Sequence, residues 1–175
     1  MRIANTVSDS IVDGPGLRFT VFTQGCRHHC PGCHNPDTHP FEGGREVSVE
    51  ALAEQMCASP LTVGLTLSGG DPMEQAEECA ALAKLAQERG LNVWTYTGYT
   101  YEGLLEEGEP GRLRLLAHTD VLVDGPFVES RKSYDALFRG SCNQRLIDLN
   151  ATRAAGTVKL WQREDPLSHF TRPES

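Results

Sequence analysis

The 175-residue sequence lacks several features that would assign it to a class of partners at once. It has no run of Lys or Arg and a net charge of −8, so it lacks the basic face that a nucleic-acid backbone requires. No apolar stretch approaches the length of a membrane span, and the first residues lead into polar sequence instead of an apolar signal core. These absences predict a cytoplasmic protein with no nucleic-acid partner and no membrane partner.

The composition is typical of a globular protein, with 39% hydrophobic and 23% charged residues and no internal repeat. A chain of this length can bury a sizeable core as one domain. We therefore expect a single domain over residues 1–162. Residues 163–175 are polar and contain two prolines, which predicts a poorly ordered C-terminal tail.

Cysteine is concentrated in one short stretch. Three of the six cysteines, Cys26, Cys30 and Cys33, form the pattern C-x3-C-x2-C. The glycines and prolines between residues 25 and 36 exclude a helix and allow the backbone to curl, so the three sulfurs can point to one place. Residues 17–24 have the composition of a strand, and the carboxyl end of a strand is where α/β folds usually place their chemistry. In a cytoplasmic chain these cysteines are expected to be ligands and not disulfides.

Two kinds of metal centre are compatible with this loop. A structural zinc ion could take a fourth ligand from one of the neighbouring histidines, His28, His29, His34 and His39. Such zinc sites usually draw two ligand pairs from separate segments, however, and no second Cys or His pair follows. A 4Fe–4S cluster normally takes four thiolates, so three would leave one iron free to bind something else.

Strand and helix signals alternate after the loop, which predicts a parallel sheet with right-handed crossovers. Residues 8–16 are expected to form a turn-rich surface loop before the first strand. Because a closed eight-stranded barrel needs roughly 200 residues or more, an open partial barrel is expected. The expected strands are 17–24, 61–67, 91–97, 121–123 and 145–149. The expected helices are 49–58, 72–89, one from about 101 that is interrupted at 108–111, and its continuation at 112–118.

A second candidate site is the turn formed by Gly69, Gly70 and Asp71 after the second expected strand. Asp71 is expected to cap the following helix, with Glu74 completing a capping box. Capping does not explain the two glycines, because glycine weakens a strand end unless the backbone must approach something closely. Thr97 and Asp124 follow later strands and are further candidates, for which ordinary turn chemistry is the alternative.

These motifs resemble a known family. C-x3-C-x2-C after a strand resembles the signature of the radical S-adenosylmethionine enzymes, and residues 13–18 with 24–26 resemble the opening of glycyl-radical-enzyme activases. More specific similarity is to the activating proteins of anaerobic ribonucleoside-triphosphate reductases, although Cys33-His34-Asn35 has the form seen in pyruvate formate-lyase activases. The resemblance covers residues 13–149, and its more specific part lies in 30–33, 94–99, 124–129 and 139–145.

The resemblance implies an α/β fold, an open partial (β/α) barrel of the radical SAM type with parallel strands and flanking helices. It implies a 4Fe–4S cluster held by Cys26, Cys30 and Cys33, whose open iron binds the methionine moiety of S-adenosylmethionine. Gly69, Gly70 and Asp71 would lie near the amino group of that moiety, although Glu is commoner than Asp at the third position. The other residues expected near the cofactors are Thr97 and Asp124, on the ribose or sulfonium side, and His34 and Asn35, which would steady the loop.

The reaction implied is one-electron cleavage of S-adenosylmethionine to a 5′-deoxyadenosyl radical, which abstracts a hydrogen from a glycine of the reductase large subunit. A flavodoxin- or ferredoxin-type protein would supply the electron. The alternatives are activation of another glycyl-radical enzyme, a small-molecule radical reaction, and a zinc-stabilised interaction module without catalysis. His28 and His29 are expected to face solvent, and Cys142 to be a loop bystander.

Overall fold

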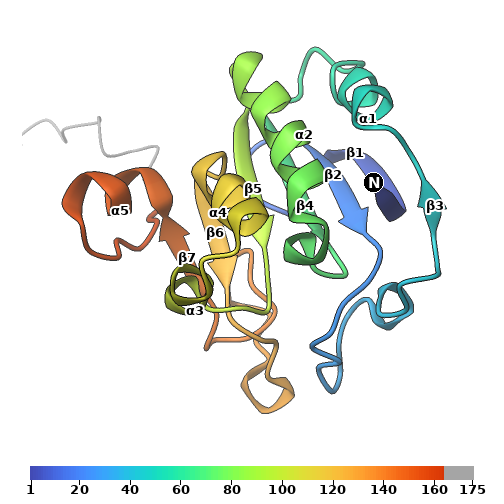
Figure 1. Ribbon diagram of the computed structural model, residues 1–175. Coiled ribbons are helices and arrows are strands. Elements are labelled where there is room, and N and C mark those ends of the chain that lie inside the picture. Colours follow the sequence, from blue (N-terminus) through green and yellow to red (C-terminus); the bar gives the residue numbers. More distant parts are fainter. Residues whose placement is uncertain (164–175) are drawn as a thin grey trace, which may run out of the picture.

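The computed structural model describes residues 1–163, which form a mixed α/β fold around one seven-stranded sheet (Figure 1). The tail expected from residue 163 lies, beyond Arg163, outside the described residues. The strands are β1 Arg2–Ser10, β2 Arg18–Thr23, β3 Arg45–Glu46, β4 Gly64–Gly69, β5 Asn92–Tyr96, β6 Val121–Asp124 and β7 Arg145–Asp148. The helices are η1 Pro36–Thr38, α1 Val49–Met56, η2 Pro72–Gln75, α2 Ala76–Glu88, α3 Tyr101–Glu107, α4 Pro110–Ala117, η3 Glu129–Arg131 and α5 Leu149–Ala155.

The sheet is parallel only at its centre. Its strand order is β3-β1-β2-β4-β5-β6-β7, and β2, β4, β5 and β6 run parallel to one another. The outer strands pair antiparallel with their neighbours, β3 and β1 on one side and β7 on the other, which differs from the parallel sheet expected from the sequence. The connection from β1 to β2 is short and has no helix, and the long connection from β6 to β7 contains only the 3-10 turn η3, so neither has the crossover α-helix that usually joins parallel strands.

Several expected boundaries need correction. Residues 8–10 belong to β1 and only 11–17 form the turn, so the strand at 18–23 is the second and not the first. The helix expected from Pro72 begins as the 3-10 turn η2 and becomes α-helical at Ala76. Helix α4 begins at Pro110, two residues earlier than expected, because the Glu109 side chain accepts hydrogen bonds from the first turn. Strand β3 and helix α5 had no counterpart among the expected elements.

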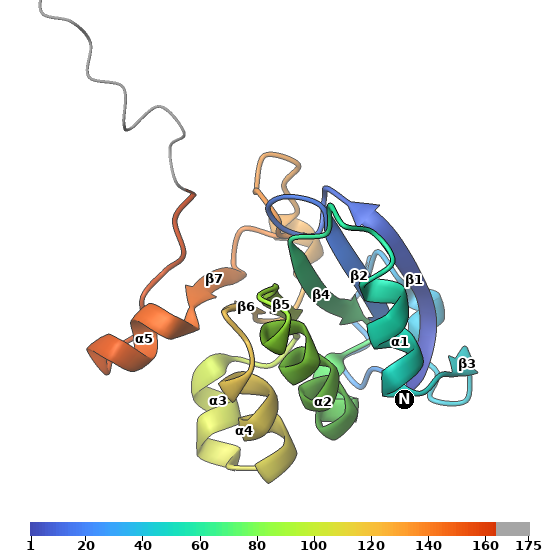
Figure 2. The ribbon, with the colours of Figure 1, turned by 90° about the horizontal axis from the view of Figure 1, so that it is seen from above.

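The two faces of the sheet have different chemistry. Figure 2 shows α1, α2, α3 and α4 on one face, and the segment between β6 and β7 on the other. Residues that point to the helices, such as Leu65, Leu67 and Val93, form the main apolar core. The opposite face has fully buried polar side chains, Arg18, Thr20 and Thr66, beside Trp94. Buried polar groups on one face indicate where a polar ligand or a hydrogen-bond network is accommodated.

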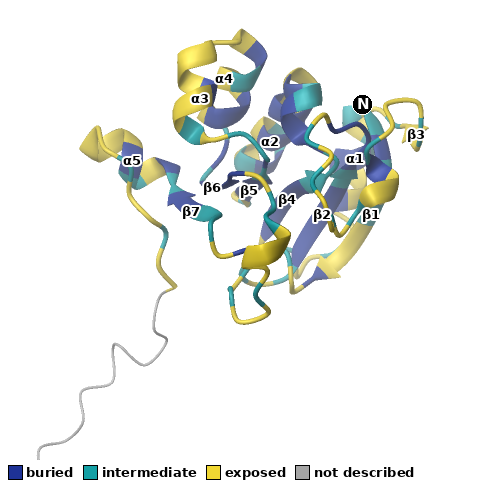
Figure 3. Cartoon of the chain, turned by 90° about the horizontal axis from the view of Figure 1, so that it is seen from below, coloured by how far each residue is buried: buried dark blue, intermediate teal, exposed yellow. Residues whose placement is uncertain are grey.

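Burial is greatest at the centre of the sheet. Figure 3 shows buried residues along the central strands and on the parts of α2 nearest to them, whereas α5 is largely exposed. No helix within residues 1–163 is both long and apolar enough to cross a membrane.

Candidate active site at the carboxyl ends of the parallel strands

A cavity of about 540 Å³ opens on the face of the sheet opposite the helices. Its volume is within the range of small-molecule sites, roughly 300–1,000 Å³. It lies at the carboxyl ends of β4 and β5, and the loop after β2 forms one wall. The lining includes all but one of the candidate residues: Cys26, Cys30, Cys33, His34, Asn35, Gly69, Gly70, Asp71 and Thr97.

A second, larger cavity of about 940 Å³ lies at the amino ends of β5 and β6, beside Trp94 and Trp161. None of its lining residues is a cysteine, a histidine or a candidate from the sequence. Polar side chains in its wall already make hydrogen bonds within the protein: the Asp120 carboxylate, for example, accepts from the Val93 backbone amide and from the Asn150 side chain. The smaller cavity is therefore the functional candidate.

The cysteine loop, residues 24–39, is closed at its base by backbone hydrogen bonds. Gly25 N donates to Thr38 O at 2.8 Å and Cys26 N donates to His39 O at 3.1 Å. The Gln24 side-chain amide also donates to the Pro40 carbonyl at 2.6 Å. These bonds fix the loop at its two ends, so that the segment between them projects over the cavity.

All three loop cysteines are free thiols and line the same cavity. Cys26 is buried and the other two are half-buried. Burial raises the pKa of the Cys26 thiol, and the nearby Asp71 carboxylate acts in the same direction. The Asn35 backbone amide donates to Cys33 Sγ at 3.4 Å.

Three free thiols line one cavity, which is the number of protein sulfurs that a four-iron cluster with one open iron would need. Within residues 1–163, no three or more Cys, His, Asp or Glu side chains form a group that could hold a metal ion. Of the histidines beside the cysteines, His28, His34 and His39 also line the cavity, whereas His29 packs against His39 at the loop surface.

Glycine is needed at both positions because other parts of the backbone pass very close to them. A Cβ on Gly69 would lie 2.5 Å from the Thr23 amide nitrogen, and its φ of +97° disfavours other residues. A Cβ on Gly70 would collide with the Gly25 carbonyl. The two glycines therefore allow the end of β4 to pack directly on the end of β2 and on the start of the cysteine loop.

Replacing Gly69 by Ala is expected to lower the free energy of unfolding by about 2–4 kcal/mol, because the φ strain and the backbone clash add. Gly125 is a matched control: it has a φ of +96° but no atom within 4 Å of its ideal Cβ. Gly125→Ala should lower the free energy of unfolding only by the backbone strain, about 1 kcal/mol. Urea denaturation of both variants measures the difference, and equal losses would contradict the close packing at Gly69.

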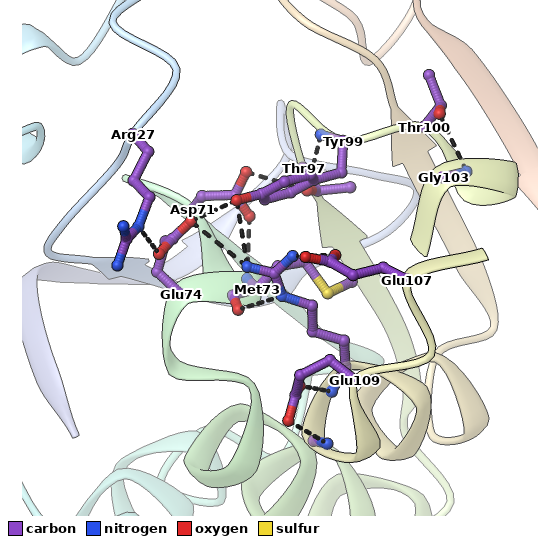
Figure 4. A network of polar contacts seen from close by, with 12 residues as sticks. Arg27, Asp71, Met73, Glu74, Thr97, Tyr99, Thr100, Gly103, Glu107 and Glu109 are labelled. Carbon is purple, nitrogen blue, oxygen red and sulfur yellow. Dashed lines mark hydrogen bonds and ion pairs between the residues drawn. The ribbon is translucent and has the colours of Figure 1, made fainter. Parts of the chain in front are cut away.

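Asp71 is the centre of the hydrogen-bond network beside the cysteines (Figure 4). Its side chain is only 1% exposed, and Oδ1 caps the turn η2 by accepting from Met73 N at 2.9 Å. Oδ2 accepts from Thr97 Oγ1 at 3.0 Å and Gly98 N at 2.9 Å, and it lies 2.9 Å from His28 Nε2. The cap expected at Asp71 is thus confirmed, and both oxygens are already engaged within the protein.

Two expectations about this region are wrong. Glu74 does not complete a capping box, because its carboxylate turns to Arg27 at 2.8 Å and to the Tyr99 hydroxyl at 2.6 Å. His28 does not face solvent: it packs edge-on against Tyr99 and contacts Asp71, whose hydrogen bond raises the histidine pKa. His29 is exposed, as expected.

The remaining candidates lie at different distances from the cavity. His34 and Asn35 line it, and the His34 ring lies 5.1 Å from the Phe127 ring. Asp124 does not line it. Its buried carboxylate accepts from Arg145 Nε at 3.0 Å and from the Tyr101 amide at 2.8 Å, and this pairing raises the pKa of Arg145.

The segment between β6 and β7 contributes a wall of the cavity that sequence reasoning did not include. Lys132, Tyr134, Phe138 and Arg139 line it, and Tyr134 is 91% exposed. Phe138 is held in place because its carbonyl accepts from the Tyr96 hydroxyl at 2.9 Å. The sequence has no periodicity over this stretch, so only the folded chain brings it to the site.

Comparison with known proteins agrees with this geometry. Residues 12–147 match the family described as a 4Fe-4S single cluster domain. The chain is 36% identical over 142 residues to an anaerobic ribonucleoside-triphosphate reductase-activating protein of Vibrio cholerae, which covers 77% of this chain and 89% of that protein. A protein of the same name from Salmonella typhi is 35% identical over 152 residues, or 82% of this chain and 96% of that protein.

Another relative is named as an activase of a different enzyme. The pyruvate formate-lyase-activating enzyme of Clostridium pasteurianum is 38% identical over 128 residues, which is 70% of this chain but only 50% of that enzyme. The family match covers most of the chain and all three loop cysteines, and the first two relatives are matched over most of their own length. The chain therefore belongs to the family of anaerobic ribonucleoside-triphosphate reductase-activating proteins, within the 4Fe-4S single cluster domain family.

Proposed function

We propose that this protein is a radical S-adenosylmethionine activase that generates a glycyl radical on the large subunit of anaerobic ribonucleoside-triphosphate reductase. The observation that supports it most is that Cys26, Cys30 and Cys33 line one cavity together with the Gly69–Asp71 turn. The names of the relatives from Vibrio cholerae and Salmonella typhi point to the same target enzyme.

In this proposal Cys26, Cys30 and Cys33 hold a 4Fe–4S cluster with one open iron, and S-adenosylmethionine binds there. When bound, these groups would supply one-electron cleavage of the bond between the sulfonium sulfur and the 5′ carbon, giving methionine and a 5′-deoxyadenosyl radical able to take a hydrogen atom from the target glycine. A flavodoxin- or ferredoxin-type protein supplies the electron. The chemistry belongs to the cofactors, and the protein binds and orients them.

The residues of this chain have distinct tasks in that arrangement. Both Asp71 oxygens are used internally, so we assign Asp71 to holding the cavity wall and assign the peptide groups of Gly69 and Gly70 to the amino group of the cofactor. Thr97 supports Asp71 from the ribose side, and His34 and Asn35 steady the loop. Asp124 acts indirectly, by fixing Arg145 and the start of α3.

The proposed architecture is an open partial (β/α) barrel of the radical SAM type, formed by one domain over residues 1–162. The helices lie outside and the cavity faces inward, as one face of the sheet is covered by α1–α4 (Figure 2). An open side suits a protein loop as substrate, and the exposed Tyr134 lies at the cavity. This reaction belongs in the cytoplasm, where reducing conditions preserve cysteine ligands.

Electron paramagnetic resonance tests this function. We expect the anaerobically reconstituted, reduced protein with S-adenosylmethionine to produce a glycyl-radical signal on the anaerobic reductase, and no signal when S-adenosylmethionine is omitted. A signal on pyruvate formate-lyase but not on the reductase would instead support the alternative target. That alternative is favoured by Cys33-His34-Asn35 and by the relative from Clostridium pasteurianum.

A non-enzymatic zinc module is separated from both activases by metal analysis. Iron and sulfide in the anaerobically purified protein are expected from the 4Fe-4S family match. Stoichiometric zinc without sulfide would overturn the proposed chemistry. A small-molecule radical enzyme would cleave S-adenosylmethionine but leave no radical on any glycyl-radical enzyme.

A further inference from the structure

The short turn η2 places two nearly buried carboxylates beside the cysteine loop. Asp71 precedes the turn and Glu74 lies within it, three positions later, so both side chains project from the same few residues. Their side chains are 1% and 4% exposed. Buried carboxylates are costly unless they are fully hydrogen-bonded, so their partners define what this turn is for.

Glu74 connects the cysteine loop to the α3–α4 side of the molecule (Figure 4). Its Oε2 accepts from Arg27 Nε at 2.8 Å, and its Oε1 accepts from the Tyr99 hydroxyl at 2.6 Å. The Arg112 guanidinium lies 3.7 Å from Oε1, donates to the Tyr99 hydroxyl, and stacks 4.3 Å from the Tyr99 ring. Arg27 lies between the first two cysteines, so this carboxylate reaches directly into the loop.

Asp71 makes the same connection through the neighbouring residues of both segments. It contacts His28, which follows Arg27, and accepts from Thr97 and Gly98, which precede Tyr99. Two consecutive residues of the cysteine loop and three consecutive residues after β5 are therefore bound by one turn. The T-shaped packing of His28 on Tyr99 brings the two segments into direct contact.

We propose that η2 clamps the cysteine loop to the segment after β5, and that Glu74 is a positioning residue for the cluster ligands. This inference rests on the proposed function for its purpose, because the loop must present its sulfurs to a cluster at a fixed distance from the bound sulfonium. An error of about 1 Å in the placement of reacting groups can cost a factor of about 10² in rate. Glu74 itself does not line the cavity, so it would act on the cysteines through Arg27 and the loop.

The test compares Glu74→Gln with Glu77→Gln. Glu77 also pairs with an arginine, Arg114, but on the exposed side of α2 and away from the loop. In the reconstituted protein, Glu74→Gln is expected to speed anaerobic iron release to a chelator about tenfold, since hydrogen bonds to charged groups are lost. Glu77→Gln should release iron at the wild-type rate.

A double-mutant cycle identifies the partner. If Arg27 acts through Glu74, then Arg27→Gln and the double variant should release iron no faster than Glu74→Gln alone. Rates that multiply would show that the two side chains act independently, and would overturn the clamp. A merely stabilising role would lower the melting temperature without changing iron release well below it.

Amide hydrogen exchange of the metal-free protein tests the clamp without any cluster. Glu74→Gln should raise exchange in residues 26–39 and 97–100, whereas Glu77→Gln should leave both segments unchanged. Unchanged exchange and unchanged iron release in Glu74→Gln would refute the inference while leaving the proposed function intact. If the wild-type protein takes up no iron and sulfide, the proposed function fails, and the exchange experiment still decides on the clamp.

Discussion

Replacing Cys30 by Ala is expected to abolish the retention of iron and sulfide almost completely. Cys30 is one of only three free cysteines that line the cavity, so in the proposed function no spare thiol there can replace it. A cluster held by two protein sulfurs has two open irons and exchanges readily with solvent ligands. Iron and sulfide analysis after anaerobic gel filtration measures the loss, and Cys26→Ala and Cys33→Ala should behave in the same way.

Two other cysteines serve as controls for that experiment. Cys79 is completely buried in α2 within the main core, where burial raises the pKa of its thiol strongly. Cys142 is exposed, and it does not line the cavity. Cys79→Ala and Cys142→Ala should both retain the wild-type iron and sulfide content. A comparable loss in either variant would show that the ligands were wrongly assigned.

Local interactions explain why much of the central fold could be predicted from the sequence. Ser48 and Thr100, residues of the types preferred at the start of a helix, cap α1 and α3: each accepts a hydrogen bond from the amide three residues later. β4, β5 and β6 are buried at most positions and are rich in apolar, aromatic and β-branched residues, which marks them as strands in the sequence. These signals lie within a few residues of the structure that they determine.

The antiparallel pairing of the outer strands depends on contacts that the sequence pattern does not reveal. β1 has polar or small residues at most positions and is exposed along much of its length, so no apolar alternation marks it as a strand. Its pairing with β2 and β3 supplies the stabilising hydrogen bonds instead. The direction of β7 likewise follows from its connection to β6 and not from its composition.

In the candidate site, too, local features could be predicted from the sequence and long-range contacts could not. The spacing of the cysteines identified the loop, because ligand spacing is a local property. His28 was misjudged because its partner, Asp71, is 43 residues away in sequence. Two adjacent glycines indicated a close approach, but only the structure shows that they approach Thr23 and Gly25 of the protein itself.

Replacing Arg18 by Met is expected to lower the free energy of unfolding by about 4 kcal/mol, the largest loss of stability that we expect from one substitution. The side chain is 0% exposed, and its guanidinium donates to Thr66 Oγ1 at 2.6 Å, Leu65 O at 2.7 Å and Asn92 Oδ1 at 2.7 Å. A Cβ on Gly64 would lie 2.6 Å from the central carbon of the Arg18 guanidinium, so the guanidinium occupies space that any side chain at residue 64 would fill. Removing it would leave buried acceptors without donors.

Arg18→Lys distinguishes the shape of the guanidinium from its charge. A lysine ammonium keeps the charge but cannot reach acceptors on β4 and β5 together, so it should recover less than half of the lost stability. Burial lowers the pKa of Arg18 to about 10, which lies below its unfolded value, so the linked stability change is confined to pH values above about 10. The loss should therefore be the same at pH 6 and pH 8, and urea denaturation at both values checks this.

An exposed arginine provides the comparison. Arg89, at the end of α2, is exposed and donates only to the Leu85 carbonyl, so Arg89→Met should change stability by less than about 0.5 kcal/mol. If Arg18→Met changed stability as little as Arg89→Met, the structure of residues 13–18 would not depend on the arginine. The expected large loss follows from the way that segment is built, because Arg18 also donates to the Pro15 carbonyl and Thr66 donates to the Asp13 carbonyl. Arg18 and Thr66 thus connect residues 13–18, which are part of the resemblance to the activases, to β4 and β5.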